Sequence, residues 1–251
     1  MSASLRNRIG RGETTFGTWI LTGSTVAVDV LSNLGFDWLT FDMEHSPISI
    51  ETAASMIQVL NRSRIAPIVR IAQIEQAGPK HALDAGAKGI IAPLVNTVAD
   101  AERVVTFCKY PPAGVRGVAG TKASRYGLDF RSYIRKANED SIVVVQIETS
   151  QAIKNVGEIV SVKGVDVAFV GPSDLTVNLG LFDDRSNVKV LDAMKEVVKA
   201  CNDAGKTAGV FASSLEEAEL AVRRGFRFIS LGSDVDHLIR GARSFLDTLK
   251  K

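Results

Sequence analysis

The sequence predicts a (β/α)8 barrel, also called a TIM barrel, from three observations. The chain has 251 residues, near the roughly 250 residues typical of this fold. Short apolar runs alternate with helical patterns throughout, and eight such runs occur. Strict alternation implies parallel βαβ units, and eight of them favour a closed barrel over an open doubly wound sheet. We expect a single domain over residues 1–251.

The expected strands are short apolar runs, as suits strands buried on both faces of a parallel sheet. Several follow a helical segment that ends at a glycine, such as NLG at 33–35 and DAG at 84–86. Glycine just past a helix end adopts the left-handed conformation that closes the last turn. The eight strands are expected at 15–21, 38–43, 66–71, 89–95, 143–149, 165–171, 207–211 and 226–232.

Helical patterns fill the gaps between these strands. A short helix is expected within residues 2–10, and apolar residues recur at helical spacing at Ile50, Ala53, Ile57 and Leu60. Three serines precede helical segments and are expected to cap them, namely Ser49, Ser214 and Ser233. The longest gap, before the fifth strand, contains the loop YPPAGVRGVAG at 110–120, and long loops are often functional.

Composition argues against several partners and compartments. The formal net charge is only +2, so there is no bulk electrostatic case for a nucleic acid or membrane partner. No apolar run approaches the roughly 20 residues of a membrane span, and the polar N-terminus has no signal core, so a cytoplasmic protein is expected. The two cysteines lack metal-type spacing, and Cys201 lies on an apolar helical stripe that predicts a core thiol.

Polar residues gather where the expected strands end, which is where TIM barrels carry their chemistry. The second strand ends in FDMEHS, with Asp42, Glu44 and His45, and the third ends at Arg70. In the fifth, Gln146 and Glu148 alternate with apolar residues, so both are expected to point into the barrel. The sixth strand is followed by Gly171, Pro172, Ser173 and Asp174.

Two carboxylates on adjacent strands, Glu148 and Asp174, could bind a hard cation such as Mg²⁺ or Mn²⁺. Few protein ligands suit a catalytic ion that keeps open positions, and zinc is disfavoured because no Cys/His cluster occurs. A glycosidase acid/base pair is an alternative, but it explains the nearby arginine and histidine less well. Each carboxylate could also be structural, as a helix cap or a paired core residue.

The histidine and arginine have plausible roles at the same rim. Histidine is the side chain suited to proton transfer near neutral pH, so His45 could act as a base, and Asp42 three residues earlier could orient it or raise its basicity. Arg70 could stabilise a developing enolate oxygen or simply form a salt bridge. No expected strand carries a lysine near its C-terminal end, and Lys88 lies at the opposite rim. A Schiff-base aldolase needs such a lysine, so a metal route is favoured for any aldolase.

Six segments together resemble the family of 4-hydroxy-2-oxo-heptanedioate and 2-dehydro-3-deoxyglucarate aldolases. They are FDWLTFDMEHSP, PIVRI, LDAGAKGIIAPLV, YPPAGVRGV, VVVQIET and VDVAFVGPSDLTVNLG. The resemblance covers nearly the whole chain and implies a class II pyruvate aldolase of the phosphoenolpyruvate/pyruvate barrel superfamily. It also implies a divalent metal (Mg²⁺, Mn²⁺ or Co²⁺), a 2-oxo acid and an aldehyde as substrates, and a homo-oligomer, often a hexamer, with exchanged C-terminal helices.

The resemblance assigns roles to individual residues. It implies metal ligands at Glu148 and Asp174, a base at His45 and a transition-state stabiliser at Arg70. Substrate contacts are implied at Gln146, at the backbone N–H of Ser173, and at the adjoining Gly171 and Pro172. Asp42 matches a partner of the histidine, and Asp84 matches a position credited with raising its basicity. The sequence places Asp84 before the fourth strand, at the opposite rim, unless a neighbouring subunit brings it close.

Two departures and two other functions are left open by the sequence. Ser173 is often alanine in the family, and Met43 stands where relatives often have a small or polar residue. An acyl-CoA lyase of the same superfamily would need a basic groove, but Lys122, Arg125 and Arg131 are scattered. A non-catalytic barrel that binds small acids is the other alternative. The aldehyde is open among succinate semialdehyde, tartronate semialdehyde, lactaldehyde and glyceraldehyde.

Overall fold

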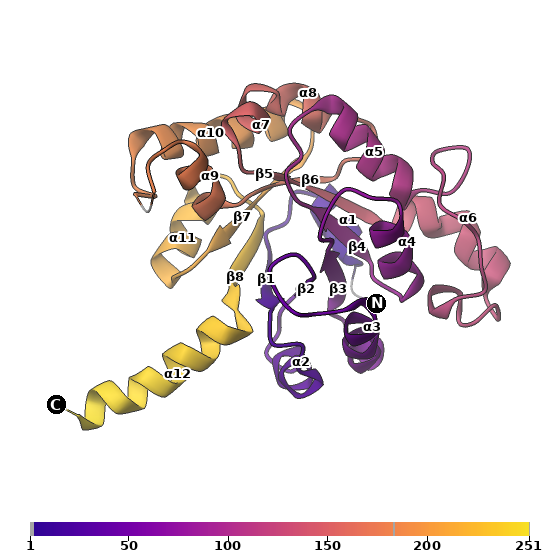
Figure 1. Cartoon of the computed structure of the whole chain (residues 1–251), viewed down its shortest axis with the longest axis horizontal. Helices are drawn as coiled ribbons and strands as arrows, with labels where there is room; N and C mark the ends of the chain where they lie inside the picture. The colour runs from indigo at the N-terminus through magenta and orange to yellow at the C-terminus, as the bar shows by residue number, and fades with distance from the viewer. Residues whose placement is uncertain (1–2, 183, 251) are drawn as a thin grey trace.

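Eight parallel strands close into a barrel in the computed structural model, which describes residues 3–182 and 184–250 (Figure 1). The strands follow chain order around the barrel, and β8 pairs back with β1. They are β1 Thr15–Ile20, β2 Trp38–Asp42, β3 Ala66–Arg70, β4 Gly89–Ala92, β5 Ile142–Ile147, β6 Val167–Val170, β7 Thr207–Ala212 and β8 Phe228–Ser233. The predicted TIM barrel is confirmed.

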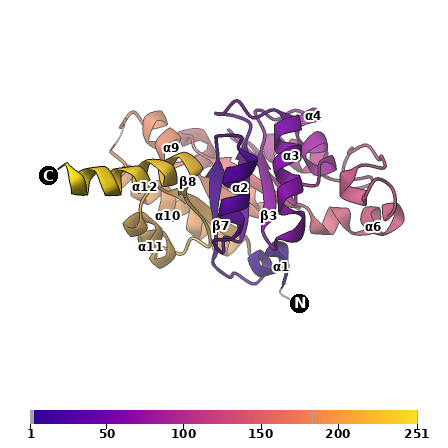
Figure 2. The same ribbon diagram turned by 90° about the horizontal axis from the view of Figure 1, so that it is seen from below.

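Helices surround the barrel and connect its strands (Figures 1 and 2). The predicted caps are confirmed: the side chains of Ser49, Ser214 and Ser233 each accept a hydrogen bond from a backbone N–H in the first turn. The helices are α1 Leu5–Gly10, α2 Thr25–Ser32, α3 Ile50–Val59, α4 Ala77–Asp84, α5 Val98–Cys108, α6 Phe130–Asp140, α7 Ser150–Lys154, α8 Val156–Ser161, α9 Pro172–Asn178, α10 Val188–Asp203, α11 Leu215–Arg223 and α12 Asp234–Leu249, with 3-10 turns at Leu60–Arg62 and Lys122–Ser124.

The observed strands lie where predicted, but several have different ends. The largest difference is β4, which stops at Ala92 and not at residue 95. Leu94 explains it, because its φ of 52° is incompatible with an extended strand. The helix predicted within residues 2–10 begins at Leu5, and residues 1–2 lie outside the described part of the chain.

Large side chains fill the lower half of the barrel interior, at the N-terminal ends of its strands. The rings of Trp38 and Phe228, each the first residue of its strand, stack with centroids 4.1 Å apart. Gly17 on β1 makes room for them, because a Cβ there would lie 2.0 Å from the Trp38 ring. The barrel interior is therefore packed at this end.

The two cysteines are buried, as predicted for Cys201. Burial raises the pKa of both thiols, Cys108 and Cys201, to about 12. Neither thiol therefore ionises near neutral pH. No helix among the described residues is long and apolar enough to cross a membrane, and the cytoplasmic location stays a prediction.

The last helix leaves the barrel. Figures 1 and 2 both show α12 projecting away from the other elements, and Asp234 in its first turn is its one buried residue. A stripe of apolar side chains along α12 is therefore exposed, at 69% for Leu238, 72% for Phe245 and 81% for Leu249.

Candidate active site

A cavity of about 330 Å³ opens at the C-terminal ends of the strands. Most of the residues predicted from the sequence line it: Asp42, His45, Arg70, Gln146, Gly171, Pro172, Ser173 and Asp174. Trp19, Phe169 and Phe211 form the apolar part of the wall, and one side is closed by Ser233 at the end of β8 with Val235 and Asp236 from the first turn of α12. The barrel thus brings together side chains that are distant in the sequence.

Arg70 is held rigidly at the centre of this rim. It is the last residue of β3 and lies in register with Asp42, the last residue of β2. Its Nε and Nη2 atoms donate to the two Asp42 oxygens at 2.8 and 2.6 Å, a buried bidentate pair. The guanidinium also lies 4.3 Å over the ring of Trp19. The one remaining nitrogen, Nη1, is directed at other site residues.

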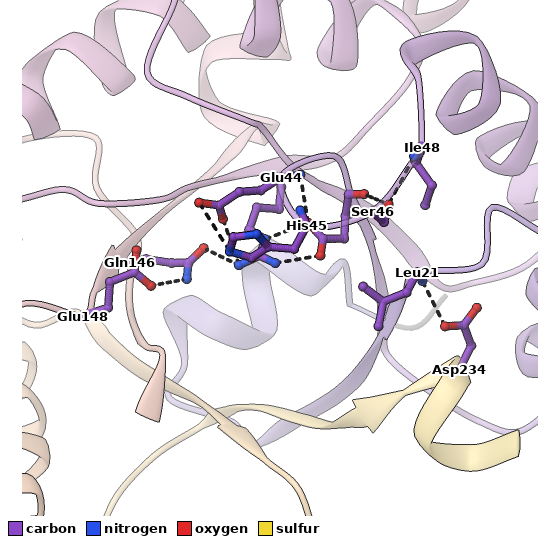
Figure 3. A network of polar contacts seen from close by, with 10 residues as sticks. Leu21, Glu44, His45, Ser46, Ile48, Gln146, Glu148 and Asp234 are labelled. Atoms are coloured by element: carbon purple, nitrogen blue, oxygen red, sulfur yellow. Dashed lines mark hydrogen bonds and ion pairs between the residues drawn. The ribbon is translucent and has the colours of Figure 1, made fainter. Parts of the chain in front are cut away.

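Glu44 contacts both Arg70 and His45, and Figure 3 shows it beside His45. Its Oε2 atom is 2.9 Å from Arg70 Nη1, an ion pair without hydrogen-bond geometry, and its Oε1 atom is 3.8 Å from His45 Nε2. Burial raises the pKa of the Glu44 carboxyl, while the Arg70 charge opposes this rise. The sequence reading placed Glu44 at the strand end but gave it no role.

His45 is open to the cavity. Its side chain is 63% exposed, and its backbone N–H donates to Asp42 Oδ1 at 3.3 Å. Asp42 therefore fixes the backbone of the β2–α3 loop, while its carboxylate pairs with Arg70. The sequence predicted Asp42 as a partner of His45, and the contact between them runs through the backbone N–H of His45, while Glu44 Oε1 lies 3.8 Å from the ring.

Glu148 lies just beyond β5, buried beside the cavity (Figure 3). Its Oε1 atom accepts from the backbone N–H of Leu94 at 2.8 Å, and its Oε2 atom accepts from Gln146 Nε2 at 2.6 Å. Burial raises the pKa of Glu148 to about 7, and the negative charges of Asp174 and Glu44 add to the rise. The unusual φ of Leu94 thus places a backbone donor against this carboxylate.

Gly171 is the point on which Glu148 and Asp174 converge. A Cβ on Gly171 would lie 2.9 Å from Glu148 Oε2 and 3.4 Å from Asp174 Oδ2. The described residues contain no group of three or more His, Cys, Asp or Glu side chains placed to hold a metal. Two converging carboxylates, of which Asp174 helps to raise the pKa of Glu148, nevertheless fit a hard divalent cation, whose other positions water and substrate oxygens can fill.

Asp84 lies away from this cavity. It ends α4, just before the start of β4, and pairs with the buried Arg116 at 2.6 Å. The Arg116 guanidinium lies 4.5 Å over the ring of Tyr110. Asp84 is thus at the opposite rim within its own chain, as the sequence placed it.

Two contacts near the cavity carry no periodic sequence signal. Arg185, in the loop between α9 and α10, donates from Nη2 to Ser173 Oγ at 2.5 Å. Asp234, at the start of α12, accepts from the backbone N–H of Leu21 at 2.9 Å and so fixes the β1–α2 loop (Figure 3). Tertiary packing places both side chains, so sequence spacing alone could not find them.

Residues 15–241 match the sequence profile of the HpcH/HpaI aldolase/citrate lyase family. The chain belongs to this family. It is 36% identical over 253 residues to a hydroxypyruvate/pyruvate aldolase of Paraburkholderia phytofirmans, covering 98% of this chain and 97% of the relative. It is 32% identical to a 4-hydroxy-2-oxo-heptane-1,7-dioate aldolase of Shigella sonnei, covering 97% of this chain and 94% of the relative.

A solved HpcH/HpaI aldolase/citrate lyase family structure, from Burkholderia cenocepacia, superposes with a TM-score of 0.95. It shares 34% identity and covers 98% of this chain and 99% of its own. The family resemblance predicted from the sequence is confirmed. The relatives are aldolases, and the chain is accordingly a carbon–carbon lyase.

Proposed function

We propose that this HpcH/HpaI family member is a metal-dependent class II aldolase over its whole length, residues 1–251. It cleaves 4-hydroxy-2-oxo acids to pyruvate, or a related 2-oxo acid, and an aldehyde, and it catalyses the reverse addition. The observation that carries the proposal is the convergence of Glu148 and Asp174 on Gly171, beside the fixed Arg70 and the open His45. The names of the curated relatives support the same reaction class.

Glu148 and Asp174 would hold the cation, and Mg²⁺, Mn²⁺ and Co²⁺ all suit their oxygen ligands. When bound, such a cation supplies Lewis-acid polarisation of the 2-oxo carbonyl. Gln146 donates to Glu148 Oε2 and fixes its orientation. Gln146 also binds the 2-oxo acid, together with the backbone N–H of Ser173 in the first turn of α9, where no intrahelical acceptor is available. Gly171 and Pro172 shape the floor of this subsite.

His45 is the base in our proposal, because its imidazole is exposed to the cavity. In cleavage it accepts the proton of the 4-hydroxyl group. The electrons of the broken carbon–carbon bond then move onto the 2-oxo acid fragment as an enolate, and the aldehyde leaves. His45 returns a proton to the methyl carbon. In the addition direction it removes that proton.

Arg70 stabilises the negative charge of the enolate oxygen through preorganised hydrogen bonding. Asp42 keeps the guanidinium in place and also holds the backbone of His45. Asp84 keeps its proposed influence on His45 only through a neighbouring subunit, since it lies at the other rim of its own barrel.

The first experiment is exchange of the pyruvate methyl protons in D₂O, followed by proton NMR with Mg²⁺ or Mn²⁺ and then with EDTA. Exchange that requires the metal is expected, and His45→Ala and Glu148→Ala should abolish it. His81→Ala, on the exposed face of α4, is the matched control and should exchange normally. Absence of exchange with every metal, or full activity of either site variant, would contradict the proposal.

An acyl-CoA lyase would need a basic groove for the nucleotide phosphates, but two of the three cations near the long loop are engaged in local contacts. Lys122 donates to Asn61 at 3.0 Å, and Arg125 pairs with Asp129 at 3.1 Å. These local contacts engage Lys122 and Arg125 individually and build no groove for nucleotide phosphates.

We further propose a homo-oligomer, a hexamer by family resemblance, in which α12 packs on a neighbouring subunit. The apolar stripe of α12 is exposed, and a second exposed stripe consists of Val26 and Val30 on α2 and Leu34 just after it. Patches of this kind on a soluble surface mark protein contacts. In light scattering after gel filtration, Phe245→Glu should reduce the assembly, whereas Ser244→Glu, off the stripe, should not. An unchanged mass for Phe245→Glu would contradict helix exchange.

A further inference from the structure

Arg185 lines a pocket of about 220 Å³ that adjoins the active-site cavity and shares Pro172 and Phe211 with it. Its Nη2 atom donates to Ser173 Oγ at 2.5 Å, and Ser173 lines the cavity together with His45 and Asp174. Its Nη1 atom lies 3.4 Å from Ser213 Oγ, just beyond β7. Hydroxyl groups that follow two neighbouring strands, β6 and β7, therefore fix the guanidinium at the rim.

The charge of Arg185 is weakly compensated by the described residues. Its one ion pair there is with Glu217, at 3.8 Å, which is beyond hydrogen-bond distance. Glu217 Oε2 instead accepts from the backbone N–H and the hydroxyl of Ser213 at 2.6 and 2.7 Å. The neighbouring Asp184 bonds to Ser186 and Asn187. The hydrogen bonds of Arg185 are thus made to neutral hydroxyl groups and its ion pair with Glu217 is long, so the guanidinium can still pair with an anion.

The cavity itself offers no second free cation for a substrate. Arg70 is the one lysine or arginine in its wall, and Asp42 and Glu44 both pair with it. The other charged wall residues include Asp174 and Asp236. An aldehyde that carries its own carboxylate would therefore find no unpaired lysine or arginine among the described residues of the cavity wall, whereas Arg185 lies next to that wall at Ser173.

We propose that Arg185 binds the remote carboxylate of the aldehyde substrate, so that the enzyme prefers oxo acids over neutral aldehydes as acceptors. This inference rests on the aldolase function proposed above and assigns its aldehyde class. In this proposal the Ser173 hydroxyl positions Arg185, because an alanine there would leave the guanidinium without its short hydrogen bond. Arg185 contacts the remote end of the aldehyde and not the reacting atoms.

The test compares two aldehydes of similar length, 4-oxobutanoate and butanal, as acceptors for pyruvate with the metal-loaded enzyme. Arg185→Gln should raise KM for 4-oxobutanoate about tenfold, as expected for losing one charge-assisted contact at a partly exposed site. KM for butanal should be unchanged. Arg223→Gln removes a charge at the end of α11 whose side chain is 64% exposed and is the matched control, expected to behave as the wild type. Added NaCl should weaken the wild-type preference for 4-oxobutanoate and have little effect on Arg185→Gln.

Metal-dependent exchange of the pyruvate methyl protons, measured in parallel, separates the two proposals. Normal exchange in Arg185→Gln together with the selective KM change supports the acceptor role. An equal effect on both aldehydes, or no effect on either, would overturn it while leaving the aldolase function intact. Absence of exchange in the wild type would instead overturn the aldolase function.

Discussion

Replacing Glu148 with glutamine should stabilise the metal-free protein at alkaline pH while abolishing its activity. The pKa of Glu148 is raised from an ordinary 4.5 to about 7, first because the carboxyl is buried and then because Asp174 and Glu44 are negative. The folded state therefore binds this proton more tightly than the unfolded state does. Between pH 4.5 and about 7 the free energy of unfolding falls as pH rises, and above that range the penalty is complete.

The magnitude follows from the width of this interval. At about 1.4 kcal/mol for each pH unit, the ionised Glu148 destabilises the metal-free fold by about 3 kcal/mol at pH 8. A glutamine removes the charge and keeps the shape. Its amide oxygen can accept from Leu94, and Gln146 can rotate its own amide to accept the new donor, since Gln146 Oε1 is held only by a 3.5 Å contact from Arg70.

The assay is urea unfolding of the wild type and Glu148→Gln in EDTA, at pH 5 and pH 8. The variant should be more stable by about 3 kcal/mol at pH 8 and nearly equal to the wild type at pH 5. Added Mn²⁺ should stabilise the wild type but not the variant, because ligand binding to the folded state raises its stability. A variant that is less stable than the wild type at pH 8, or a pH-independent difference, would refute the reasoning.

Three further perturbations test the packing. Gly171→Ala places a Cβ 2.9 Å from Glu148 Oε2, so pyruvate exchange should fall about 10–100-fold while circular dichroism is unchanged; normal exchange would show that the site tolerates the methyl group. Gly17→Ala drives a Cβ into the Trp38 ring and should lower the free energy of unfolding by about 3 kcal/mol, the upper end for overpacking; an unchanged urea midpoint would contradict this. A thiol-specific disulfide reagent should leave Cys108 and Cys201 unmodified in the native protein, since burial raises the pKa of both thiols to about 12. It should label both rapidly in urea. Rapid labelling of the native protein would argue against their burial.

Regular patterns made the fold and much of the rim predictable from the sequence. The apolar runs between helical segments identify the strands, because a strand buried on both faces is apolar along nearly its whole length. The period-two placement of Gln146 and Glu148 correctly predicts two neighbouring polar side chains, which hydrogen-bond to each other at 2.6 Å. Arg70 and Asp42 end adjacent strands, so parallel register alone brings them together.

Irregular backbone and long-range contacts were beyond such patterns. Leu94 adopts a left-handed conformation, which ends β4 early and directs its N–H toward Glu148. Leucine rarely adopts this conformation, so the sequence does not predict it. Asp42 ends β2 and Glu44 follows two residues later in the β2–α3 loop. Sequence spacing alone does not show which of the two carboxylates lies nearer the imidazole of His45. Arg185 meets Ser173 through a loop whose path no spacing rule encodes.

Because α12 extends away from the barrel, a displacement of its C-terminal end is transmitted to the cavity wall. Its first turn contributes Val235 and Asp236 to that wall, and its 16 residues extend about 24 Å at the usual rise of a helix. A helix of this length moves nearly as a rigid rod, so a force applied near Leu249 is felt at Asp234 and at the loop that Asp234 anchors. The shape of the cavity wall at Val235 and Asp236 is therefore mechanically connected to whatever binds α12 near Leu249.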